Sequence, residues 1–341
     1  MDPNVLRRSP LHLSEVGARR TLQWHPQFNA HVRRPSIPSG TLPRFGIDYK
    51  KRLTDLRTQR NENPYKFIKF EGVEERFWSQ FHNDFYESVL YKGSKATKNG
   101  PLFQHKFVVL KSLQDFNHPE VTALINRLEE WRILPLMTLE KNWNEEIIFQ
   151  FWATLWVDQA SRVLHWMTQG VHYRLDFITF SRLLGFDHLD RDAPRLSTIF
   201  AEGISEADLD AAKMYKPGAH PDLKTTHLKP YFYVLNNLLR YTIDPKFGDS
   251  IHLRQDAPKI LARFGANGGR FGVSDFMWNK IADASVDPNK DLPYAPYLMH
   301  IIEQVTGMQF SHPCILAPVR AKHLGAPHAP PLSPAGGAPP A

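Results

Sequence analysis

Apolar residues recur at helical spacing through most of the chain between residues 73 and 305, and this pattern constrains the fold more than any other feature. The first stripe places apolar residues, three of them aromatic, at steps of four: Val73, Phe77, Phe81, Phe85 and Val89. A second stripe follows Pro119, which suits a first helical turn, and comprises Val121, Leu124, Ile125, Leu128 and Trp131. Residues 143–156 carry two adjacent apolar stripes and few polar positions, so this segment is expected to be the most buried helix.

Four further helices are predicted in the second half of the chain. One spans residues 205–213, and another begins at Pro230 and runs to about residue 243. Ser274 and Asp275 are expected to cap a third. The fourth contains Leu298 to Val305 and is closed by Gly307.

Residues 162–175, RVLHWMTQGVHYRL, predict a β-hairpin instead of a helix. Two runs rich in Val, Leu, Trp and Tyr flank Thr168-Gln169-Gly170, with glycine where a positive φ is wanted. Asp176 is placed to cap a short helix after the hairpin, and Gly185 to end it. The expected fold is therefore mainly α, a multi-helix globular body with one small β-hairpin.

Composition separates this body from both termini. Residues 1–62 combine arginine pairs, prolines and isolated apolar residues, which is typical of a flexible, disordered arm. Residues 311–341 are rich in Pro, Ala and Gly and predict a disordered tail. We therefore expect three parts: an arm at 1–62, a helical domain at 63–310, and a tail at 311–341.

The positive charge of the protein is concentrated in the arm. The net charge is +7, yet residues 1–60 hold twelve Lys/Arg against four acids, a net of +8, and residues 61–341 hold thirty basic against thirty-one acidic groups, a net of −1. A polyanion should therefore meet the arm first. The candidate nucleic-acid-binding residues are Arg7, Arg8, Arg19, Arg20, Arg33, Arg34, Lys50, Lys51 and Arg52. The open alternative is a solvated arm with a role in nuclear import.

Cysteine usage and hydropathy limit the compartment and the cofactors. Cys314 is the only cysteine, which excludes an intrachain disulfide and a thiolate-rich zinc or iron–sulfur site. No apolar leader or run of eighteen apolar residues occurs, so the protein is expected to be in the nucleus or cytoplasm without a membrane partner.

The motifs that accompany catalysis and cofactor binding are missing, so no catalytic residue, cofactor or metal is predicted. Residues 265–272, GANGGRFG, lack the Gly-Lys-Ser/Thr of a phosphate-binding loop and are interpreted as an ordinary loop. His165 and His172 lie on opposite arms of the predicted hairpin, without a metal-binding spacing. A three-acid nuclease site has spacings too loose to detect in one sequence, so a cryptic transposase or nuclease stays open as the alternative function.

The body resembles the plant transposon protein domain found in open reading frames of Athila-type long-terminal-repeat retrotransposons. The resemblance is carried by LMTLEKNWNEEIIFQFWATLWVD and VLHWMTQGVHYRLDFITFSRLLGF, and extends over roughly residues 75–310. The hairpin leading into a helix that ends in Leu-Leu-Gly is also similar to the plant mobile domain, an interaction module. Either resemblance implies a transposable-element origin in plants and supplies no catalytic residues. The expected function is that of a non-enzymatic, gag-like or accessory factor, whose arm binds nucleic acid and whose body associates with itself or a protein partner.

Overall fold

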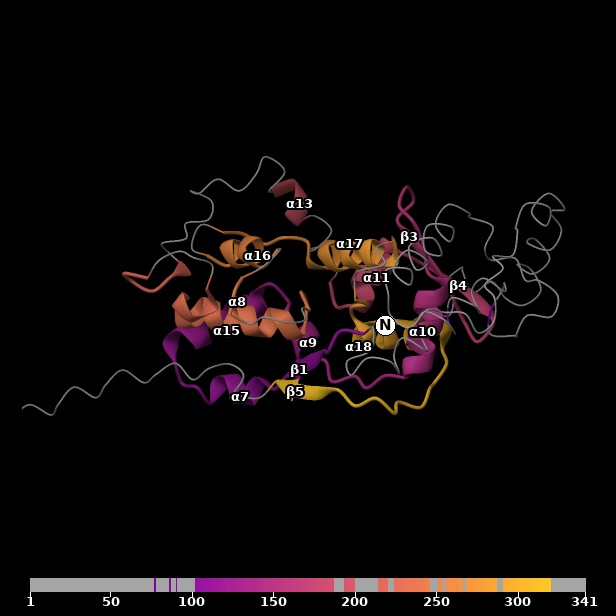
Figure 1. Ribbon diagram of the computed structural model, residues 1–341, viewed down its shortest axis with the longest axis horizontal. Coiled ribbons are helices and arrows are strands. Elements are labelled where there is room, and N and C mark those ends of the chain that lie inside the picture. The colour runs from indigo at the N-terminus through magenta and orange to yellow at the C-terminus, as the bar shows by residue number, and fades with distance from the viewer. Residues whose placement is uncertain are drawn as a thin grey trace, which may run out of the picture.

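The computed structural model describes Phe77, Tyr86, Leu90 and residues 102–186, 193–199, 214–219, 224–245, 251–253, 256–265, 268–286 and 291–319. These residues form ten α-helices, one short 3-10 helix and five strands (Figure 1). Helices therefore predominate, but the described body is a mixed α/β structure instead of a plainly helical one. The predicted arm, the predicted helix at 205–213 and most of the stripe from Val73 to Val89 lie outside the described residues.

The first four described helices are α7 (Leu110–Gln114), α8 (Pro119–Glu130), α9 (Leu134–Met137) and α10 (Glu145–Thr154). Of these, α8 and α10 follow predicted apolar stripes, whereas the short helices α7 and α9 were not predicted. Helix α8 starts at Pro119 as predicted and buries Val121, Leu124, Ile125 and Leu128. Helix α10 buries every residue from Ile147 to Thr154, which confirms the expectation that it is deeply buried.

Helix α10 is shorter at both ends than the predicted segment 143–156. The Asn144 side chain accepts hydrogen bonds from the backbone N–H groups of Glu146 and Ile147, at 3.0 and 3.3 Å, and so starts the helix at residue 145. Leu155 is extended, with ψ of 125°, and the chain then enters a strand.

The predicted hairpin is confirmed as β3 (Val163–Thr168) and β4 (Val171–Asp176). Thr168 pairs with Val171, so the loop has two residues, Gln169 and Gly170, and not the predicted three; both have positive φ, at 51° and 77°. Strand β2 (Trp156–Asp158) pairs antiparallel with β3 and enlarges the hairpin to a three-stranded sheet, which the sequence pattern did not predict. Helix α11 (Phe177–Leu183) follows, with Asp176 accepting from the Thr179 N–H at 2.9 Å and Gly185 at φ 86°, as predicted.

The second half is again helical. It contains α13 (Leu196–Ile199), η2 (Thr225–His227), α15 (Pro230–Tyr241), α16 (Ala257–Arg263), α17 (Val273–Val286) and α18 (Ala295–Thr306). The start at Pro230 and the end of α18 at Gly307, with φ 70°, are confirmed. The predicted capping role of Ser274 and Asp275 is wrong, because α17 begins at Val273 and both side chains bond to other elements.

The segment 311–319 belongs to the body, so the boundary predicted at residue 311 is wrong. Strand β5 (Ala317–Val319) pairs in parallel with β1 (Lys106–Val108), and Leu316 and Val319 are buried. Trp143 and Cys314 exchange backbone hydrogen bonds of 3.0 and 3.1 Å. The β1–β5 pairing joins segments more than two hundred residues apart, which the local apolar pattern could not reveal. Residues 320–341 lie outside the described residues.

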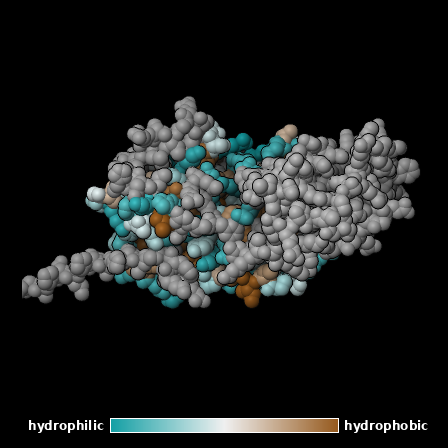
Figure 2. All heavy atoms as spheres, in the orientation of Figure 1, coloured by the Kyte–Doolittle hydropathy of each residue, from teal (hydrophilic) through white to brown (hydrophobic). Residues whose placement is uncertain are grey.

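A single hydrophobic core unites the helices and the larger sheet. Its largest fully buried side chains include Trp152, Trp166 and Trp278. Trp166 packs against Phe151, with ring centroids 5.6 Å apart, and so joins the sheet to α10. On the face drawn in Figure 2, hydrophilic residues and scattered hydrophobic ones alternate over the described surface.

Candidate functional site

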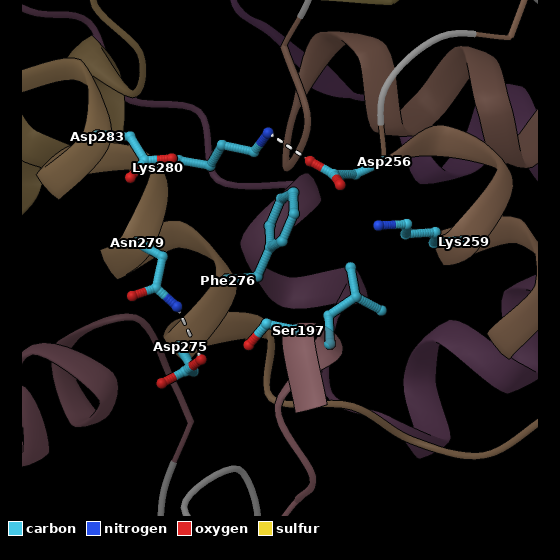
Figure 3. Close-up of a pocket in the computed structure, with 9 residues that line it drawn as sticks. Ser197, Asp256, Lys259, Asp275, Phe276, Asn279, Lys280 and Asp283 are labelled. Atoms are coloured by element: carbon cyan, nitrogen blue, oxygen red, sulfur yellow. Dashed lines mark hydrogen bonds and ion pairs between the residues drawn. The ribbon is translucent and has the colours of Figure 1, made fainter. Parts of the chain in front are cut away.

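A pocket of about 160 Å³ opens between α13, α16 and α17. Its lining is mostly polar and consists of Leu196, Ser197, Asp256, Lys259, Asp275, Phe276, Asn279, Lys280 and Asp283 (Figure 3). Asp275, Phe276, Asn279, Lys280 and Asp283 all come from α17, where residues three or four positions apart share a face. One helix thus supplies most of the charged groups.

Asp275 is the centre of one of two ionic clusters at this pocket, and 8% of its side chain is exposed. Its carboxylate accepts hydrogen bonds from Arg162 Nη2 at 2.6 Å and from Asn279 Nδ2 at 3.0 Å, and Arg195 Nε lies 3.4 Å away. The Arg162 guanidinium also lies over the Phe177 ring, 3.6 Å from its centroid. The cluster therefore links the start of β3, α11 and α17.

Lys280 is the centre of the other cluster. Its Nζ donates to Asp256 Oδ2 at 2.7 Å and lies 3.8 Å from Asp244 Oδ1. Burial alone would lower the pKa of Lys280, but the carboxylates of Asp244, Asp256 and Asp283 outweigh it and raise that pKa above its ordinary value. Lys280 therefore stays an ammonium group at neutral pH and is not a candidate nucleophile.

Three aspartates line the pocket, but their carboxylates do not converge. Asp275 faces Asn279 at one side and Asp256 faces Lys280 at another, as Figure 3 shows. Within the described part of the chain, no group of three His, Cys, Asp or Glu side chains is arranged to hold a metal ion. A two-metal nuclease needs carboxylates directed at common ions, and the described arrangement directs them at cations of the protein.

His165 and His172 are brought together by the sheet, although the sequence predicts only that they lie on separate arms. His165 Nδ1 lies 3.2 Å from His172 Nε2, with the ring centroids 5.3 Å apart. The centroid separation is nearly the nitrogen separation plus two ring radii, so the nitrogens point at each other. One donates to the other, which is the geometry of a hydrogen bond and not of two ligands converging on a metal.

The loop over residues 265–272 performs a structural role where it is described. Gly269 O accepts a hydrogen bond from Arg263 Nε at 2.8 Å, and Gly272 N–H donates to Pro194 O at 3.0 Å. A Cβ at Gly268 would lie 2.0 Å from Arg263 O, so only glycine fits there. Gly268 thus allows the loop backbone to lie close to the backbone of Arg263. This structural role agrees with the interpretation of the segment as an ordinary loop.

The nine predicted nucleic-acid-binding residues, Arg7, Arg8, Arg19, Arg20, Arg33, Arg34, Lys50, Lys51 and Arg52, all lie outside the described residues. The structure therefore tests neither their position nor their grouping. Conversely, the ionic clusters around Asp275 and Lys280 were not predicted from the sequence. The i, i+4 spacing of Asp275 and Asn279 was the only local sign that these two side chains would bond to each other. The cationic partners of Asp275 come from other elements, so their contact with it was not predictable from local spacing.

Comparison with known proteins gives no further guide. No protein family, no curated protein and no solved structure matches the chain. Among the described residues, no helix is both long enough and apolar enough to cross a lipid bilayer.

Proposed function

We propose that the protein is a non-enzymatic nucleic-acid-binding and assembly factor of a plant retroelement. In this proposal, residues 1–60 bind phosphate backbones and the folded body associates with itself or with a protein partner. The observation that carries it is the partition of charge, with +8 on residues 1–60 and −1 on the remaining 281. Lysine and arginine on an extended segment bind nucleic acid by releasing condensed counterions, without reading sequence.

The internal use of charge in the body supports a binding role over a catalytic one. Asp275 is bonded to Arg162 and Asn279, and Lys280 to Asp256, so these groups stabilise the fold. A general acid or base needs a pKa near neutrality, whereas the carboxylates hold the pKa of Lys280 above its ordinary value. The retroelement assignment rests on the resemblance of the segments around Trp143 and His165.

The decisive experiment measures binding of the full-length chain to a fluorescent duplex of about 20 base pairs by anisotropy. A variant with the nine candidate residues changed to glutamine carries −1 instead of +8 over residues 1–60. We expect its affinity in about 50 mM salt to fall at least a hundredfold and its salt dependence to flatten, since each neutralised phosphate contributes about 0.9 to the logarithmic slope.

The matched control exchanges Arg for Lys and Lys for Arg at the same nine positions, which keeps the charge. It should bind like the wild-type protein, because phosphate neutralisation depends mainly on charge. Equal affinity of the glutamine variant and the wild-type protein would show that the arm is not the nucleic-acid contact.

A metal-dependent nuclease is the second candidate, because Asp256, Asp275 and Asp283 line one pocket. The test incubates the wild-type protein with supercoiled DNA and Mn²⁺, beside an Asp256→Asn, Asp283→Asn variant. We expect no cleavage that the double variant lacks. Nicking by the wild-type protein alone would replace the binding proposal with a catalytic one.

A further inference from the structure

Residues 308–319, which we call the strap, leave the end of α18 and finish as β5 beside β1 (Figure 1). Among the described residues outside α18, the strap bonds to residues 142–144 and 106–108, which together we call the strap site. The bonded residues of the strap and the strap site are at least 167 positions apart in the sequence. These contacts therefore depend on the two segments meeting in space and not on their connection along the chain.

The strap is held mainly through backbone and polar groups. Asn144 Nδ2 donates to Ser311 O at 3.0 Å, and Leu316 N–H donates to Asn142 Oδ1 at 2.8 Å. Of the strap side chains, only Leu316 and Val319 are buried. A segment with few buried apolar groups opens at a lower free energy than the core helices, because water can replace its polar bonds.

The strap site has support of its own that does not come from the strap. Lys141 bonds to Glu303 of α18, and the Asn144 N–H donates to Met299 Sδ at 3.5 Å. The Asn144 side chain caps α10, and β1 lies against α15. None of these contacts involves the strap, so the strap site stays formed when the strap opens and can accept an extended segment of the same sequence.

We infer that two bodies associate by exchanging straps, each strap filling the strap site of a second copy of this chain. This inference rests on the proposed function, because it names the surface through which the body associates with itself. The strap is the occupant that the site fits, since the backbone N–H and C=O groups of Cys314 both bond to Trp143, at 3.1 and 3.0 Å. An exchanged strap forms the same bonds, so the cost of exchange lies in the hinge and in the entropy of association.

Gly307 is suited to be the hinge of this exchange. It ends α18 with φ 70°, and no atom lies within 4 Å of the place that its Cβ would occupy. Glycine adopts extended backbone about as readily as left-handed backbone, so rotation at Gly307 redirects the strap without a steric clash. Met308 and Phe310, which are half-buried, move with the strap into the same contacts on the second copy.

Exchange competes with closure of each strap on its own body. The short connection gives a tethered strap an effective concentration on the order of 1 mM, so dilute chains stay closed and concentrated chains exchange. In the proposed function, several arms bound to one nucleic acid bring their bodies to such local concentrations. The closed single body and the exchanged pair are therefore two states that share the same strap contacts.

The test joins two different chains by a disulfide that requires exchange. Both full-length chains carry Cys314→Ser, which removes the only native cysteine; one adds Lys106→Cys and the other adds Ala317→Cys. Lys106 and Ala317 are neighbours in the β1–β5 pairing, and neither chain contains both new cysteines. After mixing at about 1 mM and mild oxidation, we expect a covalent heterodimer on a non-reducing gel.

The matched control replaces the Ala317→Cys chain with a Ser311→Cys chain. Ser311 is an exposed residue of the same strap, as Ala317 is, but it does not pair with β1. Its mixture with the Lys106→Cys chain should yield at most about a tenth as much heterodimer, because only random collisions join these two cysteines. Equal yields from the two mixtures would overturn the inference. Thermal unfolding close to that of the wild-type protein verifies the fold of each variant.

Sedimentation velocity of the wild-type chain at the same concentration separates this inference from the proposed function. Wild-type dimers together with equal heterodimer yields would reject strap exchange and retain self-association through another surface. Wild-type monomers together with equal yields would reject both. A heterodimer specific to the Ala317→Cys mixture supports strap exchange, and the nine-residue arm variant tests nucleic-acid binding independently.

Discussion

At the scale of single residues, the most consequential side chain described is Asp275. Only 8% of its side chain is exposed, and it neutralises Arg162, whose own side chain is 26% exposed. The guanidinium is held between this carboxylate and the Phe177 ring. Removing the carboxylate would leave a cation in a partly dehydrated site, which costs more than the pair itself contributes.

We expect Asp275→Asn to lower the free energy of unfolding by about 2 to 3 kcal/mol, because asparagine keeps the shape but not the charge. Urea unfolding, monitored by tryptophan fluorescence, measures the change in the free energy of unfolding. Asp283→Asn, on the same helix and exposed, is the control and should change stability by less than about 0.5 kcal/mol. Equal effects would contradict the assigned role of the Arg162 pair.

Two buried histidines and one half-buried histidine should make the protein sensitive to acid. Burial lowers the pKa of His105 and of His172 from 6.5 to about 3, and burial together with the Arg174 charge lowers that of His165 to about 4. Between pH 6.5 and about 4, the unfolded chain binds protons at these rings and the folded chain does not. The free energy of unfolding is therefore not reduced by these rings above pH 6.5. It decreases as the pH falls from 6.5 towards 4, because proton binding then favours the unfolded chain.

The variant His105→Gln tests this pH dependence. The Tyr294 N–H donates a hydrogen bond to His105 Nε2 at 2.7 Å. A glutamine side chain can still accept this hydrogen bond, but it does not titrate. The slope of unfolding free energy against pH between 6.5 and 4 should become shallower by about 1.4 kcal/mol per pH unit. A slope identical to that of the wild-type protein would show that His105 is protonated in the folded state.

Residue roles were predictable from sequence only where they act locally. Asp176 caps the start of α11 and Gly185 follows its end with a positive φ, and both roles were predicted. Asp275 and Ser274 looked like local caps, but their partners Arg162 and Ser181 lie about a hundred residues earlier. Nothing in a helical pattern encodes such partners, because they are set by how the helix packs.

At the scale of elements, the hairpin illustrates how far local chemistry determines structure. Gln169 and Gly170 both have positive φ, the requirement of a two-residue turn that matches strand twist. The Gln169 N–H donates to Gln150 Oε1 at 2.9 Å, and Gln150 is fully buried in α10. The turn was predictable from glycine, whereas its anchor to α10 and the third strand β2 were not.

Substitutions at Gly170 should rank by their tolerance of φ 77°. We expect Gly170→Asn to cost a few tenths of a kcal/mol, Gly170→Ala about 1 kcal/mol and Gly170→Val more, because β-branching disfavours left-handed backbone most. Thermal unfolding by circular dichroism measures the series. An alanine variant as stable as the asparagine variant would argue against this turn geometry.

At the scale of the whole molecule, the C-terminal segment 311–319 is part of the body and not a tail. Glu303 on α18, which is buried, bonds to Lys141 and to His312, the latter at 2.6 Å. Burial would raise the pKa of Glu303, but hydrogen bonds from Lys141 and His312 outweigh it and lower that pKa. Composition misled the prediction, because Pro and Ala in Ala317-Pro318-Val319 resemble the residues that follow them.

Two truncated chains test whether residues 311–319 belong to the folded body or to a tail. A chain ending at Val319 keeps β5, whereas one ending at Phe310 loses β5, His312 and the buried Leu316 and Val319. We expect the shorter chain to be less stable than the longer one by about 3 to 5 kcal/mol, chiefly from the two apolar side chains. Equal urea midpoints for the two truncations would restore the boundary at residue 311.

The parallel pairing of β1 with β5 also governs when folding can finish. Lys106 and Ala317 become neighbours only after roughly 200 intervening residues have been synthesised. During translation, helices such as α8 and α10 can form early, but β5 is the last of the described helices and strands to be synthesised. A nascent chain stalled before residue 317 would leave β1 without its partner, and the exposed backbone of that strand would be open to pairing with another nascent chain.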